Sequence, residues 1–443
     1  MIRIVFSMKY QIPKGLFDIL PYGEDQDWRL TNQWQYVEWL IHRLARDYGY
    51  LEMRTPVFEK TEVFHHSVGA TTDIVSKEMY TFLDKAERSM SLRPEGTAPL
   101  VRAFVEKNLA QYGQLHKFYY IGPMFRYERM QKGRYRQFHQ FGIEAIGPMS
   151  AELDVEVIDL LNEFFSRLGL KDITIQLNSV GTTECRLKYK KKLLEYLKPH
   201  FSKLSKDSKE RFEKNPLRIL DSKDPEDKKL VEKAPSILDM LSKEAKEHFK
   251  KVCDLLKMLK IPYEINDKLV RGLDYYTNTV FEFTSSHLGA QNAIGAGGRY
   301  DSLVNSFGGP DLPGVGFATG LERVIQTMVS QRVDFPSLSF PFVYFIPLSS
   351  SAKDFCFEKA TELRHLSIPT EIDLDAKKIQ KSLQKASKAK AIYCVIFGEE
   401  EWQKKQIQLK NLETREQKNI ALEDLLPTLQ SYWKDFSQKN KLL

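Results

Sequence analysis

The stretch KFYYIGPMFRYERMQKGRYRQFHQFGIEAIG, residues Lys117–Gly147, is the part of the chain from which the fold can best be predicted. Aromatic and β-branched residues fill both of its halves, and basic residues gather around Gly133 between them. This pattern is typical of a β-hairpin. The sequence therefore predicts two strands, Lys117–Tyr127 and Gln137–Ile146, joined by a polar loop.

One face of the second predicted strand suits a ligand better than a protein core. Because side chains alternate along a strand, this face carries Phe138, Gln140, Gly142 and Glu144. A ring, an amide, a gap and a carboxylate pack poorly together but could form the floor of a site for a small polar molecule. The loop adds a basic rim, which Arg126 and Glu128 adjoin. A solvated face without a ligand remains the alternative, since antiparallel sheets often present one polar face to water.

Length and composition indicate an ordinary globular protein of several domains. The 443 residues suggest two to four domains of roughly 100–200 residues each. Hydrophobic residues make up 42% of the chain, and no apolar run approaches the roughly 20 residues that span a membrane. The net charge of +7 is compatible with an anionic partner such as nucleic acid. The four cysteines lie far apart without metal-binding spacing, so we expect a reduced, cytoplasmic protein.

The N-terminal region combines a helix with an extended segment. Apolar residues recurring every three or four positions predict a helix from about Glu24 to Tyr48, ended by Gly49. Tyr50–Phe58 has strand character, but Pro56 removes a backbone donor and restricts this strand to an edge or an interface. A helix and a proline-bearing strand make a poor isolated unit, and we expect them to pack against a second subunit.

A turn and a helix start are predicted in Ser91–Glu106, SLRPEGTAPLVRAFVE. Pro94 and Gly96 indicate the turn, and Thr97 is the expected N-cap of the helix. Glu95 allows two interpretations. It could lie at the positive end of the helix dipole, or it could bind an ammonium group.

The middle of the chain is predicted to be helical. Ser150–Leu168 has the spacing of one helix, and from residue 183 to 263 the sequence becomes lysine-rich with apolar residues at helical intervals. This second segment predicts an all-helical insertion between two parts richer in strands. Its lysines, such as Lys188 and Lys190–Lys192, would form a solvated helix face or contact a nucleic-acid backbone.

Three further segments combine strand character with glycine or arginine. Leu269–Phe283, LVRGLDYYTNTVFEF, places Arg271 before an alternating strand, and Ala293–Leu303, AIGAGGRYDSL, would let another group approach its backbone closely. Gly314–Val329, GVGFATGLERVIQTMV, passes from a strand into a helix. Arg323 in this helix could meet a phosphate, stack on a base or lie on the surface. Neither a G-x-G-x-x-G motif nor a P-loop occurs, so any ATP site is of another kind.

The last part of the chain, after a linker at Phe335–Pro341, alternates strands and helices. This order predicts a small α/β domain with a largely parallel sheet, a hairpin near Gln406–Ala421 and a final helix. The expected strands and helices are Val343–Leu348, Ala352–Leu366, Ile368–Leu374, Lys377–Ala389 and Ala391–Phe397. A basic run suits an RNA backbone or a solvated helix face: Lys377, Lys378, Lys381, Lys385, Lys388 and Lys390.

Five of these segments together resemble the histidyl-tRNA synthetase family of class II aminoacyl-tRNA synthetases. They are RPEGTA, FRYERxxKGRYRQFHQFGIE, RGLDYYTNTVFEF, GGRYDSL and GVGFATGLERV, and the resemblance runs from about Gln11 to the C-terminus. It implies an α+β catalytic core with a mixed, mostly antiparallel sheet flanked by helices, an all-helical insertion and a C-terminal α/β anticodon-binding domain. The expected boundaries are 1–182 and 264–334 for the core, 183–263 for the insertion and 335–443 for the C-terminal domain.

The resemblance implies a two-step reaction. ATP and L-histidine would form histidyl-adenylate and pyrophosphate, and histidine would then pass to the 3′-terminal ribose of tRNA(His). Arg126 and Arg271 are the implied catalytic residues, because fixed guanidinium groups would offset the charge that builds up at the α-phosphate. The implied ATP-binding residues are Arg126, Glu128, Arg134, Phe138, Arg271 and Arg323. The implied histidine-binding residues are Glu95, Gly96, Thr97, Gln140, Glu144, Tyr275 and Tyr276.

Finer roles follow from the same resemblance. Phe138 and Arg323 would enclose the adenine, and Arg134 would reach the distal phosphates. The imidazole nitrogens would bond to Glu144 and Tyr276, with Tyr275 lining the pocket. The ammonium end of histidine would be held by Glu95, Thr97 and Gln140.

The resemblance further implies Mg²⁺ carried with ATP, a homodimer and no membrane association, and it assigns no metal ligand with certainty. Arg129 and Gln131 are the candidates for contact with the tRNA acceptor end. Tyr127 and Met130 depart from residues common in bacterial relatives, which concerns the tRNA contacts of this loop rather than adenylate formation.

Two other functions fit parts of the pattern. The first is a synthetase-like regulatory subunit of ATP phosphoribosyltransferase, and the second is a non-catalytic sensor of uncharged tRNA. Regulatory paralogues generally lack the C-terminal domain and have lost the RPEGT and Arg271–Tyr276 segments, whereas this sequence contains all of them. The sequence also contains no kinase motif that would accompany a sensor.

Overall fold

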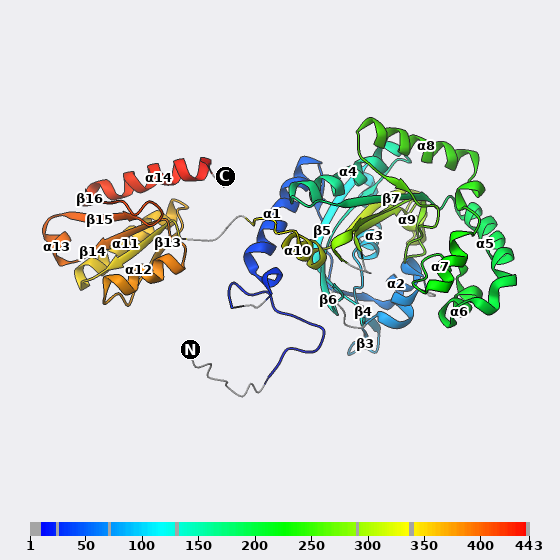
Figure 1. Cartoon of the computed structure of the whole chain (residues 1–443), viewed down its shortest axis with the longest axis horizontal. Coiled ribbons are helices and arrows are strands. Elements are labelled where there is room, and N and C mark those ends of the chain that lie inside the picture. Colours follow the sequence, from blue (N-terminus) through cyan, green and yellow to red (C-terminus); the bar gives the residue numbers. More distant parts are fainter. Residues whose placement is uncertain are drawn as a thin grey trace. The chain divides into compact units, whose positions relative to one another are not determined.

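The computed structural model describes residues 10–23, 26–69, 72–128, 133–288, 292–335 and 341–439. The chain forms two compact units, Met1–Phe335 and Pro336–Leu443, each with its own sheet and core (Figure 1). Among the described residues, no helix is both long and apolar enough to cross a bilayer.

An eight-stranded sheet organises the first unit, in the order β1-β5-β6-β11-β10-β9-β7-β8. Its two edge pairs, β1 with β5 and β7 with β8, are parallel, and every other pair is antiparallel. The predicted mixed, mostly antiparallel sheet is thereby confirmed. Its strands are β1 (Leu51–Glu52), β5 (His116–Phe125), β6 (Gln137–Ile146), β7 (Ile173–Ser179), β8 (Glu264–Ile265), β9 (Thr277–Ser285), β10 (Ala293–Arg299) and β11 (Gly314–Gly320).

The predicted hairpin forms the second and third strands of this sheet. Strand β5 pairs with β6 from His116–Ile146 to Phe125–Gln137, and β6 has the predicted bounds. The alternation expected along β6 is present. Phe141, Ile143 and Ala145 are fully buried in the main core on one side of the sheet, whereas Gln140 and Glu144 line the cavities on the other side, which are described below.

Helices cover both faces of the sheet. The main core lies between one face and α1 (Thr31–Asp47), α4 (Ala151–Arg167), α8 (Lys243–Met258) and α10 (Leu321–Ser330). On the opposite face a smaller core involves α3 (Thr97–Glu106) and α9 (Leu303–Ser306). This second face is only partly covered, which leaves room for a site over β6, β10 and β11.

Helix α1 is shorter than predicted. It begins at Thr31, after the 3₁₀ turn Asp27–Arg29, rather than near Glu24. The reason is a backbone contact, because the amide of Leu20 donates to Arg29 O (3.0 Å) and the amide of Thr31 donates to Leu20 O (2.9 Å). These bonds hold Leu30 in an extended conformation, so the α-helix begins only at Thr31.

The predicted strand Tyr50–Phe58 is wrong in its middle. Only β1 and a second short strand, β2 (Phe58–Lys60), are formed, and β2 joins a separate antiparallel sheet with β4 (Ser89–Leu92) and β3 (Thr81–Leu83). Pro56 has no amide hydrogen, and the Arg93 guanidinium donates to the carbonyl oxygens of Thr55 (2.9 Å) and Pro56 (3.4 Å). Thr55 and Pro56 therefore bond to a side chain instead of a neighbouring strand.

The prediction of Thr97 as an N-cap is also wrong. Helix α3 begins at Thr97, and the Glu95 carboxylate takes the capping role by accepting bonds from the amides of Thr97 (2.7 Å) and Ala98 (2.9 Å). The Thr97 hydroxyl is thus available for a different contact, described below.

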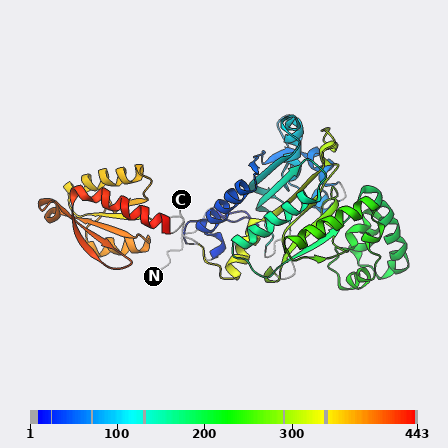
Figure 2. The same ribbon diagram turned by 90° about the horizontal axis from the view of Figure 1, so that it is seen from above.

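The lysine-rich segment is helical, as predicted. It contains α5 (Thr183–Leu197), α6 (Lys206–Lys214), α7 (Pro225–Glu232) and α8, which are drawn in green and lie together in both Figure 1 and Figure 2. Their N-caps are side chains of Thr182, Ser205, Asp224 and Ser242. The first three helices share a small core that also includes Leu269 and Val280, whereas α8 packs into the main core beside α4.

The second unit contains a five-stranded sheet in the order β13-β12-β14-β15-β16. The pairs of β12 with β13 and β14 are parallel and the remaining two are antiparallel, so the sheet is mixed rather than largely parallel. Its strands are β12 (Val343–Pro347), β13 (Thr370–Ile372), β14 (Tyr393–Phe397), β15 (Gln406–Asn411) and β16 (Gln417–Ala421). Its helices are α11 (Ser350–His365), α12 (Ile379–Lys388), α13 (Glu399–Gln403) and α14 (Leu425–Lys439).

Candidate active site

Two adjacent cavities lie on the partly covered face of the large sheet. The first, which we call the arginine cavity, has a volume of about 170 Å³. It is lined by four arginines together with polar and small residues of β6, β10, β11 and α10: Arg126, Glu128, Gly133, Arg134, Tyr135, Phe138, Gln140, Arg271, Ala293, Ile294, Gly295, Ala296, Ala318, Gly320, Glu322 and Arg323.

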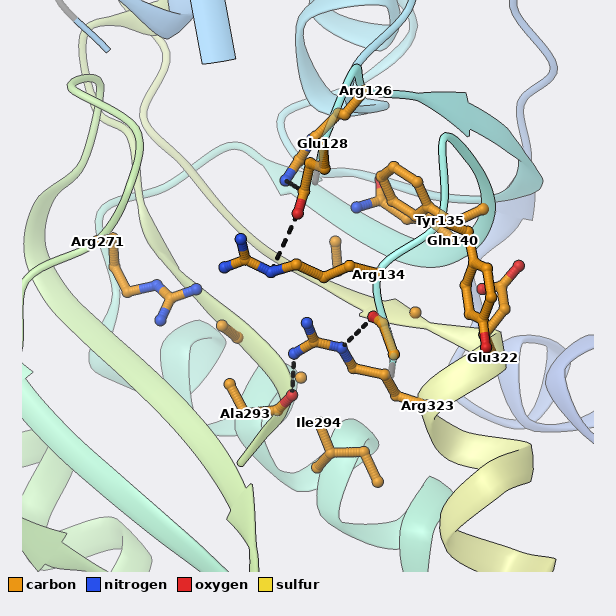
Figure 3. A pocket seen from close by; sticks show the side chains of 16 residues that line it. Arg126, Glu128, Arg134, Tyr135, Gln140, Arg271, Ala293, Ile294, Glu322 and Arg323 are labelled. Carbon is orange, nitrogen blue, oxygen red and sulfur yellow. Dashed lines mark hydrogen bonds and ion pairs between the residues drawn. The ribbon is translucent and has the colours of Figure 1, made fainter. Parts of the chain in front are cut away.

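The arginines converge on one space. Figure 3 shows the guanidinium groups of Arg134, Arg271 and Arg323 pointing toward one another across the cavity, with Arg126 beside Glu128 at its rim. Like charges that line one cavity repel each other, so this arrangement favours binding of an anion that neutralises them. The structure therefore brings together every arginine that the sequence assigned to ATP.

Protein oxygens hold each arginine in place. Arg126 Nε donates to Pro94 O (2.9 Å), and Arg323 donates from Nε to Gly133 O (3.1 Å) and from Nη1 to Ala293 O (2.7 Å). Arg134 Nε forms an ion pair with Glu128 (3.0 Å), and Arg271 is paired with Glu282. Side chains fixed in this way are preorganised for charge stabilisation.

Phe138 provides the apolar surface of the arginine cavity. Its ring lies under the Arg126 guanidinium, with Arg126 Cζ 5.2 Å from the ring centroid. Arg323 lines the same cavity, and burial lowers the pKa of its guanidinium. A flat ring and a planar guanidinium in one cavity are suited to binding a heteroaromatic base.

Glu322, which was not among the residues predicted from the sequence, connects two elements that line the arginine cavity. Its carboxylate accepts a bond from the His139 amide (2.8 Å) and lies 3.0 Å from His139 Nδ1. This contact ties the start of α10, and with it Arg323, to strand β6. No pattern in the sequence indicates the pair, because its two members are far apart along the chain.

The second cavity, which we call the tyrosine cavity, has a volume of about 160 Å³ and shares Arg126, Gln140 and Arg271 with the first. It is deeper in the fold, and its lining combines two carboxylates with aromatic side chains. The lining residues are Glu95, Thr97, Arg126, Gln140, Glu144, Arg271, Leu273, Tyr275, Tyr276, Ala296, Tyr300, Gly316, Phe317 and Ala318.

Glu144 is the central polar group of the tyrosine cavity. Its carboxylate accepts bonds from the Thr97 hydroxyl (2.6 Å) and the Tyr300 hydroxyl (2.5 Å), and the residue is 1% exposed. Burial raises the pKa of Glu144 to about 8, and the two hydroxyl bonds only partly offset this effect. Gly316 makes room for this carboxylate, because a Cβ there would lie 2.0 Å from Glu144 Oε2.

Of the two interpretations of Glu95, the structure confirms the place at the helix start, and binding of an ammonium group stays a prediction. It caps α3 through two backbone amides and also lines the tyrosine cavity. The residue is 3% exposed, and burial raises the pKa of its carboxyl group. Two buried carboxylates in one cavity favour a cationic or hydrogen-bond-donating ligand.

Two polar side-chain atoms in the wall between the two cavities make no hydrogen bond within the protein. Within the described part of the chain, Gln140 Oε1 and Arg271 Nε are buried without a hydrogen bond. Buried polar atoms are rarely left unpaired in proteins unless a ligand or water completes them. Tyr275 and Tyr276 line the same cavity, and burial raises the pKa of Tyr276 to about 12, so its hydroxyl stays protonated at neutral pH.

The structure thus unites most of the residues predicted from sequence. Gly96 lines neither cavity and lies against the Tyr120 ring, where a Cβ would come within 2.3 Å of that ring. Arg129 and Gln131 lie outside the described residues. Sequence reasoning missed Tyr300, although the motif GGRYDSL that contains it was noticed, and it also missed the apolar contacts of Leu273 and Phe317.

Comparisons with known proteins show the family of this chain. A family model described as histidyl-tRNA synthetase matches residues 27–324, and one described as an anticodon-binding domain matches residues 343–432. The histidine–tRNA ligase of Protochlamydia amoebophila is 53% identical over 96% of this chain and the whole of that protein. The histidine–tRNA ligase of Chlamydia pneumoniae is 49% identical over 93% of this chain and 95% of that protein.

Solved structures show the same relationship. The apo histidyl-tRNA synthetase of S. aureus superposes with a TM-score of 0.79 at 32% identity, covering 95% of this chain and 99% of that one. A protein from Bacillus halodurans described as an ATP phosphoribosyltransferase regulatory subunit/histidyl-tRNA synthetase has a TM-score of 0.61 at 20% identity, covering 85% of this chain and 97% of that one, which is a likeness of fold alone. The family model, the curated relatives and the S. aureus structure thus agree over nearly the full length, and the chain belongs to the histidyl-tRNA synthetase family.

Proposed function

We propose that this chain is a histidine–tRNA ligase that joins ATP and L-histidine to histidyl-adenylate with release of pyrophosphate, and then transfers histidine to the 3′-terminal ribose of tRNA(His). The observation that carries this proposal is the meeting of the two cavities at Arg126, Gln140 and Arg271. A cation-lined cavity joined to one with buried carboxylates suits two substrates that must react at their common boundary.

In the first step the histidine carboxylate attacks the α-phosphorus of ATP, and pyrophosphate leaves. Negative charge builds up between two anionic groups, so the fixed guanidinium groups of Arg126 and Arg271 stabilise the transition state. Both residues line the shared wall. Phe138 and Arg323 enclose the adenine, and Arg134, which is paired with Glu128, binds the distal phosphates.

Histidine is selected in the tyrosine cavity. Glu144 and Tyr276 bond to the two imidazole nitrogens, because one side chain accepts and the other donates a hydrogen bond. Glu95, Thr97 and Gln140 hold the ammonium end, and Tyr275 lines the pocket. A site with such buried polar groups rejects amino acids that leave them unpaired, by roughly 10⁴–10⁵-fold.

Mg²⁺ enters with ATP in this proposal. The described residues contain no cluster of three histidine, cysteine or carboxylate side chains that could hold a metal ion. Glu128 and Glu282, next to the arginine cavity, are the carboxylates that could complete the shell of an ion carried by the phosphates. The ion would add charge neutralisation at the phosphates.

The tRNA contacts in this proposal involve both units. Arg129 and Gln131 remain our candidates for the acceptor end. In the second unit, lysines at the start of α12 border a hollow of about 570 Å³, which supports binding of the anticodon region there: Lys377, Lys378 and Lys381. Lys385 instead pairs with Asp373 (2.6 Å).

We also propose a cytoplasmic homodimer and keep the domain boundaries 1–182, 183–263, 264–334 and 335–443. Exposed apolar side chains near the proline-bearing segment support a subunit interface: Leu51, Val57, Phe58, Phe82 and Leu83. Sedimentation would show an active dimer. A preparation that is fully active as a monomer would contradict this part of the proposal.

Exchange of pyrophosphate into ATP, measured separately with histidine and with each other amino acid, tests the function. We expect exchange with histidine alone, abolished in Arg271→Ala while the circular dichroism and melting temperature stay close to those of the wild type. A regulatory subunit or a tRNA sensor would give no exchange. Absence of histidine-dependent exchange in the intact wild type would therefore overturn the proposed function.

A further inference from the structure

The segment Arg271–Tyr276 carries three side chains of the two cavities but has no regular secondary structure. It connects β8 to β9 and contributes Arg271, Tyr275 and Tyr276. A flexible segment would lose orientation unless neighbouring elements fixed it, and small displacements of a reacting group cost large factors in rate. The contacts that fix this segment are therefore relevant to activity.

Three side chains of the helical insertion donate hydrogen bonds to this segment. Arg218 Nη1 donates to Arg271 O (3.3 Å), and Asn215 Nδ2 donates to Asp274 Oδ1 (3.1 Å). Arg186 Nη1, from α5, donates to Asp274 O (3.0 Å). From the catalytic core, the Asp274 amide donates to Val68 O (3.2 Å). The insertion thus holds both ends of the turn that presents the catalytic arginine and the tyrosines.

Arg218 lies at the centre of these contacts. Its side chain is 18% exposed, and Nη2 lies 3.8 Å from Asp73 Oδ2, which Arg211 also approaches at 3.7 Å. Gly272 lies directly beneath it, since a Cβ at that position would be 3.2 Å from Arg218 Nη1. The Arg218 side chain is mostly buried, lies near the Asp73 carboxylate and is bonded to the Arg271–Tyr276 segment. It therefore has little freedom to move.

The site is also open toward the insertion on this side. A hollow of about 630 Å³ lies between α6 and the core, and its lining includes Arg126 and Arg134 together with Arg211, Arg218 and Gly272. Residues of the insertion and of the arginine cavity thus border the same space. A shift of α6 relative to the core would change this space and the bonds to the Arg271–Tyr276 segment together.

We propose that the helical insertion positions the histidine-binding segment, with Arg218 and Asn215 as its positioning residues. The inference rests on the proposed function, because it concerns histidine activation. Neither residue touches the substrates. Both act through the orientation of Arg271 and the two tyrosines. Because the tyrosines line the tyrosine cavity alone, loss of either residue lowers kcat and raises the KM for histidine more than the KM for ATP.

The test uses the full-length protein and histidine-dependent pyrophosphate exchange, with Arg218→Ala, Asn215→Ala, Arg218→Lys and the exposed neighbour Lys214→Ala as matched control. We expect Arg218→Ala to lower kcat/KM for histidine about tenfold, and Asn215→Ala somewhat less, as for a lost hydrogen bond to a charged or polar partner. Arg218→Lys, which keeps one donor and the charge, should recover part of this loss. Lys214→Ala should match the wild type.

The wild type serves to separate the two proposals. If it shows no exchange, the proposed function fails. If it shows exchange while Arg218→Ala and Asn215→Ala both match Lys214→Ala, the inference is wrong. An equal rise of the KM for histidine and for ATP would also overturn it, because that result indicates a general loss of structure.

A double-mutant cycle keeps the inference testable if Arg218→Ala fails to fold. It combines Asn215→Ala with Asp274→Ala, whose side chains form one bond (3.1 Å). Positioning predicts that the double variant loses no more kcat/KM for histidine than the more affected single variant. Losses that multiply would show that the two side chains act independently and would contradict the proposal.

Discussion

The arginine cavity and the tyrosine cavity share a wall but are built in contrasting ways. In the first, the charged side chains keep contact with solvent, with Arg126, Arg134 and Arg271 at 20%, 34% and 22% exposure. In the second, Glu95 and Glu144 are 3% and 1% exposed. Partly exposed arginine side chains can bind anions of different structure. Buried carboxyl groups, in contrast, require a ligand with matching hydrogen-bonding groups. The contrast assigns charge stabilisation to one cavity and substrate selection to the other.

The largest loss of activity should follow from substitution of an arginine that lines both cavities. Arg126→Ala removes a guanidinium that borders both cavities, and we expect kcat/KM for exchange to fall by about 10²–10³-fold, as when one preorganised donor is lost at a charge-developing centre. Both substrates should be affected. Steady-state exchange kinetics at varied ATP and varied histidine measure this. A loss confined to one substrate would contradict the shared position of Arg126.

A substitution inside the tyrosine cavity should affect the binding of histidine and not that of ATP. Glu144→Gln replaces one acceptor oxygen by a donor where Thr97 and Tyr300 already donate. We expect kcat/KM for histidine to fall by about 10²-fold, since a buried polar group then lacks its partner, and the KM for ATP to stay the same. The exposed Glu232→Gln is the matched control. A parallel change in the KM for ATP would remove the distinction between the cavities.

Removal of a single hydroxyl group from the tyrosine cavity should weaken the selection of histidine without abolishing it. Tyr300→Phe deletes the hydroxyl that donates to Glu144 (2.5 Å) and keeps the ring. We expect about a tenfold loss in kcat/KM for histidine, in line with the loss of one buried hydrogen bond. Exchange kinetics provide the measurement. An unchanged value would show that Tyr300 only packs, and a loss as large as that of Glu144→Gln would assign it a direct contact with histidine.

A separate effect concerns stability and pH. Burial raises the pKa of Glu144 from the ordinary 4.5 to about 8 in the folded chain. Between these values the folded chain binds the proton and the unfolded chain has lost it, so this group makes stability fall as pH rises, by at most about 1.4 kcal/mol per pH unit. Urea unfolding of wild type and Glu144→Gln across this window measures the difference. A difference that does not change with pH would contradict the raised pKa.

The same contrast explains what could be predicted from the sequence. The arginine cavity is built largely from the hairpin β5–β6 and the start of α10, where local alternation and charge are visible in the chain, and the bounds of β6 were predicted correctly. The tyrosine cavity depends on contacts between distant residues. Tyr300 reaches Glu144 across 156 positions, and no local pattern indicates that pairing.

The wrong predictions have the same origin. The strand expected at Tyr50–Phe58 is interrupted because the Arg93 guanidinium, which is distant in sequence, donates hydrogen bonds to the carbonyl oxygens of Thr55 and Pro56. Thr97 had the right residue type for an N-cap, but Glu95 bonds the helix amides and Thr97 turns to Glu144. Local propensity predicted these elements, and tertiary contacts decided between the options that propensity allowed.

The central claim is that the arginine cavity holds the nucleotide and the tyrosine cavity holds histidine. A crystal structure of the protein with ATP and histidinol tests it most directly. The account predicts adenine between Phe138 and Arg323, the α-phosphate beside Arg126, and the imidazole within hydrogen-bond distance of Glu144 and Tyr276. Histidinol bound anywhere other than beside Glu144 and Tyr276 would contradict it.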